Sequence, residues 1–292
     1  MGNFIKVSLL VFAFSSCSTQ KRFILSDEKP TLIANTFSFT EGPAANSDGD
    51  VFFTDQPNDK IYEWKWKTNN ISQFLDNANR ANGTYFDSKG NLLTCSDENG
   101  EILEFNVDKN KTVLLTGFKG KRLNGPNDLW VDNDSIYFTD PLYKRDYWKN
   151  FKQAILKENV YLRKPNGETI IVDSTLQKPN GIIGDSKNQN LFVADIVGGK
   201  IYKYKIKKDG TLFNKTIFCS MGSDGMTIDK NGNVYLTGNG VTVFNKNGLE
   251  IKHINIPEKW TSNVTFGGKN FSTLFITASE SVYMLPTRMK GL

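Results

Sequence analysis

The stretch Pro126-Asn127-Asp128-Leu129-Trp130-Val131-Asp132, followed by Ser135-Ile136-Tyr137-Phe138-Thr139-Asp140, decides the fold. It opens with polar residues, continues as a short apolar run, and ends in a second apolar run that finishes in Thr-Asp. Short apolar runs joined by an Asn- or Asp-rich turn are typical of two antiparallel strands. The stretch therefore predicts a β-hairpin led by Asn127.

The same pattern is repeated five more times along the chain. Each copy begins with a side chain that carries an oxygen, and we call these six the lead residues: Glu41, Asn82, Asn127, Asn180, Asp224 and Asn263. They are spaced 41, 45, 53, 44 and 39 residues apart. Four-stranded propeller blades repeat every 40–50 residues or so. The spacing therefore predicts six blades.

Further apolar runs complete each repeat. A third run follows every pair, as at 60–62 and 281–283, and an outer fourth run follows in several repeats, as at 71–75. Residues 31–33 form an extra run with no lead residue, so we expect them to complete the last blade and close the ring. The prediction is an all-β fold over residues 30–292: a six-bladed β-propeller with four-stranded antiparallel blades around a central channel.

Composition agrees with a folded β domain and argues against nucleic-acid binding. Hydrophobic residues make up 38% of the chain and aromatic residues 12%, while the net charge of +5 comes from scattered lysines and arginines rather than a cluster. Cys95 and Cys219 lie far apart inside apolar runs, which favours two buried free thiols over a disulfide or a metal pair.

The first residues are typical of a targeting segment. Lys6 precedes an apolar run at 7–14 that is too short to span a bilayer, and Ser15-Ser16-Cys17 resembles a bacterial lipobox. We therefore predict a lipoprotein signal peptide at 1–16, lipidation of Cys17 and a tether at 17–29. The protein would be an exported bacterial lipoprotein facing the periplasm or cell surface, touching the membrane only through its lipid. The alternative is an ordinary secretory signal with a chance cysteine.

Equivalent positions in a radial repeat lie at equal height, so the lead residues should converge at the channel mouth. Two carboxylates and four amides without thiolate or imidazole suit a hard divalent cation. Ca²⁺ is the first expectation, with Mg²⁺, Mn²⁺ or Zn²⁺ as alternatives. The sole histidine, His253, lies in an outer run and is expected to be structural or exposed. The lead residues could instead be plain turn formers, which would explain Asn82 but not Glu41.

At several of these motifs the chain resembles the regucalcin/gluconolactonase family, over residues 30–290. The motifs occur in the family's order: Glu41-Gly42-Pro43, Pro126-Asn127-Asp128, Phe138-Thr139-Asp140-Pro141, Pro179-Asn180-Gly181, Ser223-Asp224-Gly225-Met226 and Phe266-Gly267-Gly268-Lys269. The resemblance implies a six-bladed propeller that binds one divalent cation on its axis and hydrolyses lactones of sugar acids, such as gluconolactone.

The resemblance also implies roles for single residues. Glu41, Asn180 and Asp224 would bind the metal, Asp224 would also donate and accept the proton, and Asn127 would contact metal or substrate. Some members hold the substrate with an Arg two residues before that Asn. Here that position is Gly125, with Arg122 nearby, so sugar specificity cannot be carried over. The His dyad of the paraoxonases has no candidate in this chain.

Residues 142–148 form a long aromatic segment after the second strand of the third repeat. We expect it to overhang the channel as a lid or substrate wall, or else to be a packed surface loop. Asp140 and Tyr143 are candidates to contact the substrate from there. Asn82 and Asn263 are further substrate-binding candidates, reached through water.

Other functions share this pattern. A propeller can be a non-catalytic binding module, although a scaffold has no need of the Glu41 and Asp224 pair on its axis. The metal could instead serve another ester, as in an esterase or phosphotriesterase. A condensing propeller of the strictosidine-synthase type is disfavoured by the Asn180 and Asp224 motifs. We expect a monomer whose partner is a small lactone.

Overall fold

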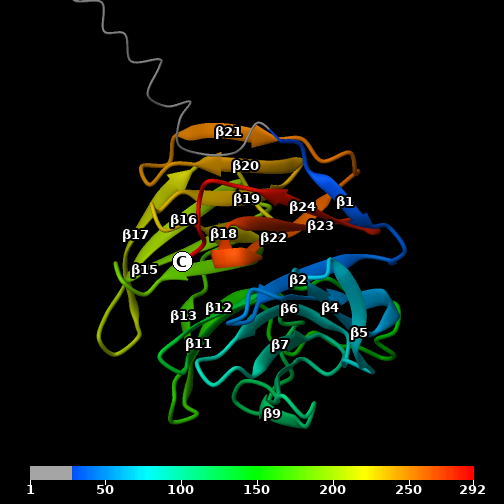
Figure 1. Cartoon of the computed structure of the whole chain (residues 1–292). Helices are drawn as coiled ribbons and strands as arrows, with labels where there is room; N and C mark the ends of the chain where they lie inside the picture. The colour runs from blue at the N-terminus through cyan, green and yellow to red at the C-terminus, as the bar shows by residue number, and fades with distance from the viewer. Residues whose placement is uncertain (1–27) are drawn as a thin grey trace, which may run out of the picture.

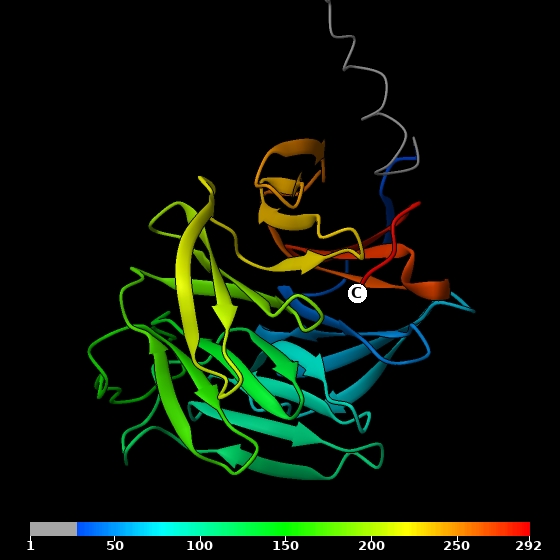
Figure 2. The ribbon, with the colours of Figure 1, turned by 90° about the vertical axis from the view of Figure 1, so that its left-hand side faces the viewer.

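Six four-stranded antiparallel sheets make up the protein, in a computed structural model that describes residues 28–292. In Figure 2 they follow one another around a ring, from blue and cyan through green and yellow to orange and red. The first three sheets contain β2 (Thr40–Ala45), β3 (Val51–Asp55), β4 (Lys60–Lys65) and β5 (Asn70–Asp76); β6 (Ala81–Phe86), β7 (Leu92–Ser96), β8 (Glu101–Phe105) and β9 (Lys111–Leu115); and β10 (Leu129–Asp132), β11 (Ser135–Asp140), β12 (Asn159–Arg163) and β13 (Thr169–Asp173).

The remaining sheets repeat the plan. They contain β14 (Pro179–Asp185), β15 (Asn190–Asp195), β16 (Lys200–Ile206) and β17 (Leu212–Cys219); β18 (Met226–Ile228), β19 (Val234–Gly238), β20 (Gly240–Phe244) and β21 (Glu250–Ile254); and β22 (Thr261–Gly267), β23 (Thr273–Ala278), β24 (Ser281–Pro286) and β1 (Thr31–Ala34). Two short 3₁₀ turns, η2 (Gln56–Asn58) and η3 (Lys269–Phe271), were not predicted. The six-bladed prediction is confirmed.

Strand β1 closes the ring. It pairs antiparallel with β24, with Thr31 opposite Met284, and Figure 1 shows it in blue beside the red and orange strands of the last blade. The first strand of the described chain therefore completes the last blade, as predicted. This removes the free β24 edge that could otherwise pair with another chain.

The core lies between neighbouring blades. Phe53 and Trp64 of the first blade pack against Phe275 of the sixth, with ring centroids 5.4 and 5.3 Å apart. Trp130 of the third blade packs in one cluster with Ile182 of the fourth. Large apolar side chains on alternate strand positions thus fill each gap between sheets, and this packing sets the blade angle that builds the channel.

The predictions outside the site can now be compared with the structure. Cys95 and Cys219 are both free and buried, and His253 is exposed on the outer strand β21, where its Nδ1 lies 3.0 Å from Thr242 Oγ1. Both predictions are confirmed. The predicted signal peptide, Cys17 and nearly all of the tether lie outside the described residues. Between residues 28 and 292 no helix is long and apolar enough to cross a membrane.

Candidate active site

The lead residues stand at the channel ends of the inner strands. Glu41, Asn82 and Asn180 are the second residues of β2, β6 and β14, while Asn127 and Asp224 come just before β10 and β18. The strand pairing is irregular directly after the first three. Such irregularities bend a strand and redirect its side chains, here toward the channel.

Threonines of the second strands hold the backbone of the next blade in place. Thr54 Oγ1 donates to the carbonyl of Asn82 at 3.0 Å, and Thr139 Oγ1 to that of Asn180 at 2.7 Å. The matching bond to the sixth blade is donated by Thr237 Oγ1 of the fifth blade to the carbonyl of Ser262, at 2.8 Å. Ser262 therefore occupies the equivalent position in that blade, and Asn263 lies one residue beyond it.

A cavity of about 260 Å³ opens at this end of the channel. Four lead residues line it, Glu41, Asn82, Asn127 and Asp224, together with Tyr143, Arg145 and Trp260 among others. A fifth, Asn180, donates from Nδ2 to the Tyr143 hydroxyl at 2.9 Å. Residues spread over nearly two hundred positions thus meet in one small volume.

The two carboxylates of the cavity, the buried Glu41 and the half-buried Asp224, repel each other. Burial raises the pKa of Glu41 well above its usual value, and the charge of Asp224 raises it further. Burial likewise raises the pKa of Asp224 to about 6, although hydrogen bonds from Trp260 and Asn180 and the charge of Arg145 counter the rise. The bond from Trp260 Nε1 to Asp224 Oδ2 measures 2.6 Å. Positive charge from the protein therefore does not fully offset the burial of these two carboxylates.

Beneath this layer lies a second one, formed by Asn263, which was predicted to contact the substrate but does not line the cavity, and by Asp128, which sequence reasoning missed. Asn263 donates from Nδ2 to Glu41 Oε2 at 3.1 Å, and Asp128 is buried beside it, with a pKa raised by burial to about 7. Asp128 also accepts backbone N–H groups of Leu129 at 2.9 Å and Ile182 at 3.3 Å. A signal was available, because a carboxylate directly follows lead residue Asn127.

Glycines make room for the second layer. A Cβ on Gly225 would lie 1.9 Å from Asn263 Cγ, and one on Gly83 would lie 2.6 Å from Asp128 Oδ1. The Gly that follows a lead residue is therefore needed where a neighbouring blade sends a side chain across the channel.

Asp140, a predicted substrate contact, does not line the cavity. Its two oxygens accept the backbone N–H groups of Asn124 at 3.0 Å and Gly125 at 2.8 Å. The first and fourth blades repeat this arrangement. Asp55 accepts the N–H groups three and two residues before Glu41, and Asp195 accepts those three and two residues before Asn180. The Asp of the Thr-Asp motif thus fixes the approach to a lead residue, so its carboxylate is fully engaged away from the channel.

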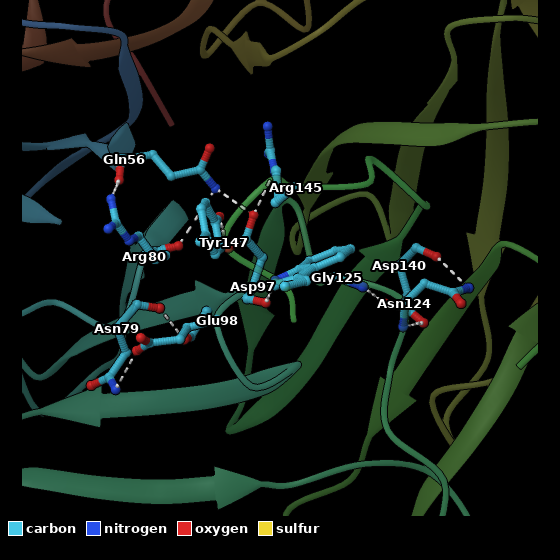
Figure 3. A network of polar contacts seen from close by, with 12 residues as sticks. Gln56, Asn79, Arg80, Asp97, Glu98, Asn124, Gly125, Asp140, Arg145 and Tyr147 are labelled. Carbon is cyan, nitrogen blue, oxygen red and sulfur yellow. Dashed lines mark hydrogen bonds and ion pairs between the residues drawn. The ribbon is translucent and has the colours of Figure 1, made fainter. Parts of the chain in front are cut away.

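The segment between β11 and β12 lines the cavity through Tyr143 and Arg145 and contacts Asp97 of the second blade, as Figure 3 shows. Arg145 Nε donates to Asp97 Oδ2 at 2.8 Å, and the Tyr147 hydroxyl donates to Asp97 Oδ1. Trp148 Nε1 donates to the Asp97 carbonyl at 2.8 Å, and its ring lies 3.0 Å from where a Cβ on Gly125 would stand. The segment is an ordered wall of the cavity, and we call residues 141–158 the lid segment.

The donor set fits a hard divalent cation. From residue 28 onward no group of three or more His, Cys, Asp or Glu side chains forms a metal cluster. The cavity instead combines two carboxylates with amides, which is an oxygen-only set that Ca²⁺ accepts. Raised pKa values of Glu41 and Asp224 are expected for two neighbouring carboxylates in a cavity without a bound cation. The metal-binding roles of Glu41, Asn127, Asn180 and Asp224 stay predictions.

The fold and the site together define a six-bladed propeller with an acidic, amide-rich cavity at one end of its channel. The chain belongs to the SMP-30/gluconolactonase/LRE-like family, whose profile matches residues 39–280. This confirms the resemblance found in the motifs.

Individual relatives agree with that assignment. The chain is 27% identical to a gluconolactonase of Zymomonas mobilis over 295 aligned positions, covering 89% of this chain and 82% of the relative. It is 26% identical to the diisopropyl-fluorophosphatase of Loligo vulgaris, covering 68% of each. A solved gluconolactonase structure from Xanthomonas campestris superposes with a TM-score of 0.82 at 27% identity, covering 90% of both chains.

Proposed function

We propose that the protein is a divalent-cation-dependent hydrolase that opens lactones of sugar acids to their hydroxy acids. The observation that carries the proposal is the pair of carboxylates, the buried Glu41 and the half-buried Asp224, which share one cavity with the amides of Asn82 and Asn127. Similarity to gluconolactonases of Zymomonas mobilis and Xanthomonas campestris supports lactone hydrolysis.

Glu41, Asn127, Asn180 and Asp224 would hold the cation, with Ca²⁺ as the first candidate. When bound, the cation polarises the lactone carbonyl and stabilises the negative charge that develops on its oxygen. A solved calcium-binding regucalcin from Agrobacterium tumefaciens shares the fold, at 15% identity and a TM-score of 0.77, which supports Ca²⁺ as the first candidate.

Asp224 is the candidate proton-transfer residue. It would accept a proton from the attacking water as the new C–O bond forms, and return it to the ring oxygen as the old C–O bond breaks. Trp260 holds Oδ2 of this carboxylate at 2.6 Å, which limits its rotation and directs its other oxygen. Asn180 is oriented in turn by its bond to Tyr143.

A panel of lactones tests the proposal. Metal-stripped protein should be inactive on glucono-δ-lactone and should regain activity when Ca²⁺, Mg²⁺, Mn²⁺ or Zn²⁺ is added singly. Asp224→Ala should abolish the cation-dependent turnover while the circular dichroism spectrum stays that of the wild type. Unchanged turnover in that variant would remove Asp224 from this role, and turnover that survives chelation would remove the cation.

A second candidate is hydrolysis of a phosphorus ester at the same site. Similarity to the squid diisopropyl-fluorophosphatase favours it, because the same oxygen-rich cavity could polarise a phosphoryl oxygen. Including an organophosphorus fluoridate in the panel separates the two, and binding without turnover of any substrate would favour a non-catalytic module.

We also propose that the protein is exported as a monomeric lipoprotein anchored through Cys17. The support is the segment Ser15-Ser16-Cys17 after a short apolar run. Cys17→Ser should move the protein from the membrane fraction to the soluble fraction and end labelling with a fatty acid. Size-exclusion chromatography of the protein without its lipid tests the monomer.

A further inference from the structure

Two arginines flank the contact between the lid segment and the second blade, and they are used differently. Arg122 donates from Nη1 to the carbonyls of Leu123 at 2.8 Å and Asn124 at 3.1 Å. Its Nη2 donates to those of Asp97 at 2.7 Å and Glu98 at 3.2 Å. Its guanidinium also lies over the Trp148 ring, 4.6 Å from the centroid. Both terminal amino groups of Arg122 are thus bound by the protein, and the side chain serves to hold the lid segment.

Arg145 is only partly used. Its Nε is bound to Asp97, but among residues 28–292 no oxygen accepts a hydrogen bond from its two terminal amino groups. The side chain is 29% exposed and lines the same cavity as Glu41 and Asp224. Four N–H donors in a rigid planar fork are therefore available at the cavity wall.

The position of the fork is fixed by its partner. Asp97 is 3% exposed and also accepts from Gln56 Nε2 at 2.8 Å and from the Tyr147 hydroxyl, so it cannot follow Arg145 if the arginine swings away (Figure 3). A donor held this way loses little conformational freedom on binding a ligand. Asp97 is therefore a positioning residue for Arg145.

The lid segment also fills the space beside Gly125. A Cβ there would meet Trp148 at 3.0 and 3.3 Å, so the lid tryptophan covers the space that a longer side chain at 125 would need. The same segment that closes this position delivers Arg145 to the cavity.

We propose that Arg145 is a specificity-determining residue, whose free amino groups donate hydrogen bonds to the hydroxyl oxygens of a lactone ring seated over Glu41 and Asp224. The inference rests on the proposed function and narrows it: the enzyme selects polyhydroxylated lactones over unsubstituted ones. A site built to bind a substrate hydroxyl discriminates strongly against an analogue without it, since its buried donors are then left unpaired.

The test compares two substrates on full-length protein loaded with the activating cation. Glucono-δ-lactone carries ring hydroxyls and δ-valerolactone carries none. Arg145→Met should lower kcat/KM for glucono-δ-lactone by about 10- to 100-fold, mostly through KM, and change δ-valerolactone by less than about threefold. Gluconate binding, measured by calorimetry, should weaken in parallel. Lys144→Met, an exposed neighbour in the same segment, removes the same charge and should change neither substrate.

Arg145→Lys provides a second variant if loss of the Asp97 partner prevents folding. It retains the positive charge but not the fork, so most of the selectivity should still be lost. Equal losses on both lactones would show that Arg145 only supports the lid segment, and no loss on glucono-δ-lactone would also overturn the inference. A wild-type protein that hydrolyses neither lactone would instead remove the proposed function, and the inference with it.

Discussion

Removing the Asp224 charge should stabilise the metal-free protein at neutral pH. Burial raises the pKa of this carboxyl from its ordinary value of 3.8 to about 6. Each pKa unit corresponds to about 1.4 kcal/mol, so the ionised group costs the fold about 3 kcal/mol above pH 6. That cost already includes the opposing effect of the hydrogen bonds from Trp260 and Asn180, which an asparagine accepts less well, by about 1 kcal/mol. Asp224→Asn should therefore gain about 2 kcal/mol.

The sign of the pH dependence follows from the raised pKa. The folded protein prefers the protonated acid, so the penalty is absent below pH 3.8, grows between pH 3.8 and about 6, and is complete above that. Free energies of unfolding measured by urea titration in EDTA should thus show the gain at pH 7.5 and little of it at pH 4. With saturating cation the wild type should recover its stability, and Asp224→Asn should not.

Asp195→Asn is the matched control. Asp195 is buried as well as engaged: it accepts the backbone N–H groups of Gln177 at 2.9 Å, Lys178 at 3.0 Å and Gly198 at 2.9 Å. Its variant should lose about 1–3 kcal/mol in EDTA and should still respond to cation. The reasoning about Asp224 is refuted if Asp224→Asn is less stable than the wild type at pH 7.5, or if its gain is equally large at pH 4.

Three further predictions concern the same channel and its closure. Cation binding should weaken about tenfold between pH 7 and pH 5, because protons compete for Asp224 below its pKa of about 6; calorimetry would contradict this with a pH-independent affinity. Gly225→Ala should force Asn263 off Glu41 and lower the free energy of unfolding by about 1–3 kcal/mol, and an unchanged urea midpoint would count against the second layer. Deleting residues 28–34 should expose the β24 edge and promote aggregation on heating, so a truncated protein that melts like the wild type would argue against closure by β1.

The sequence by itself determined the architecture and most of the residues of the cavity. A period near that of propeller blades, with a hairpin in each copy, was enough to place six blades and the closing strand. It also brought Glu41, Asn82, Asn127 and Asp224 to one end of the channel, because equivalent positions of a radial repeat share a height. That inference needed no knowledge of side-chain direction.

Only the tertiary structure decided which way individual side chains point. A shift of one residue reverses the face of a strand, so Ser262 rather than Asn263 takes the lead position. The Asp128 side chain likewise packs over Gly83 of the neighbouring blade. The Asp140 carboxylate accepts a hydrogen bond from the backbone N–H of Asn124 instead of facing the cavity.

The contacts of the lid segment likewise could not be predicted from the sequence. Arg145 reaches the cavity because Asp97, 48 residues earlier and in another blade, fixes its guanidinium. A contact between an insertion in one repeat and the edge of another has no period in the sequence. That contact depends on how the blades pack. The hydrogen-bond donors that the cavity offers to a substrate depend on the same packing.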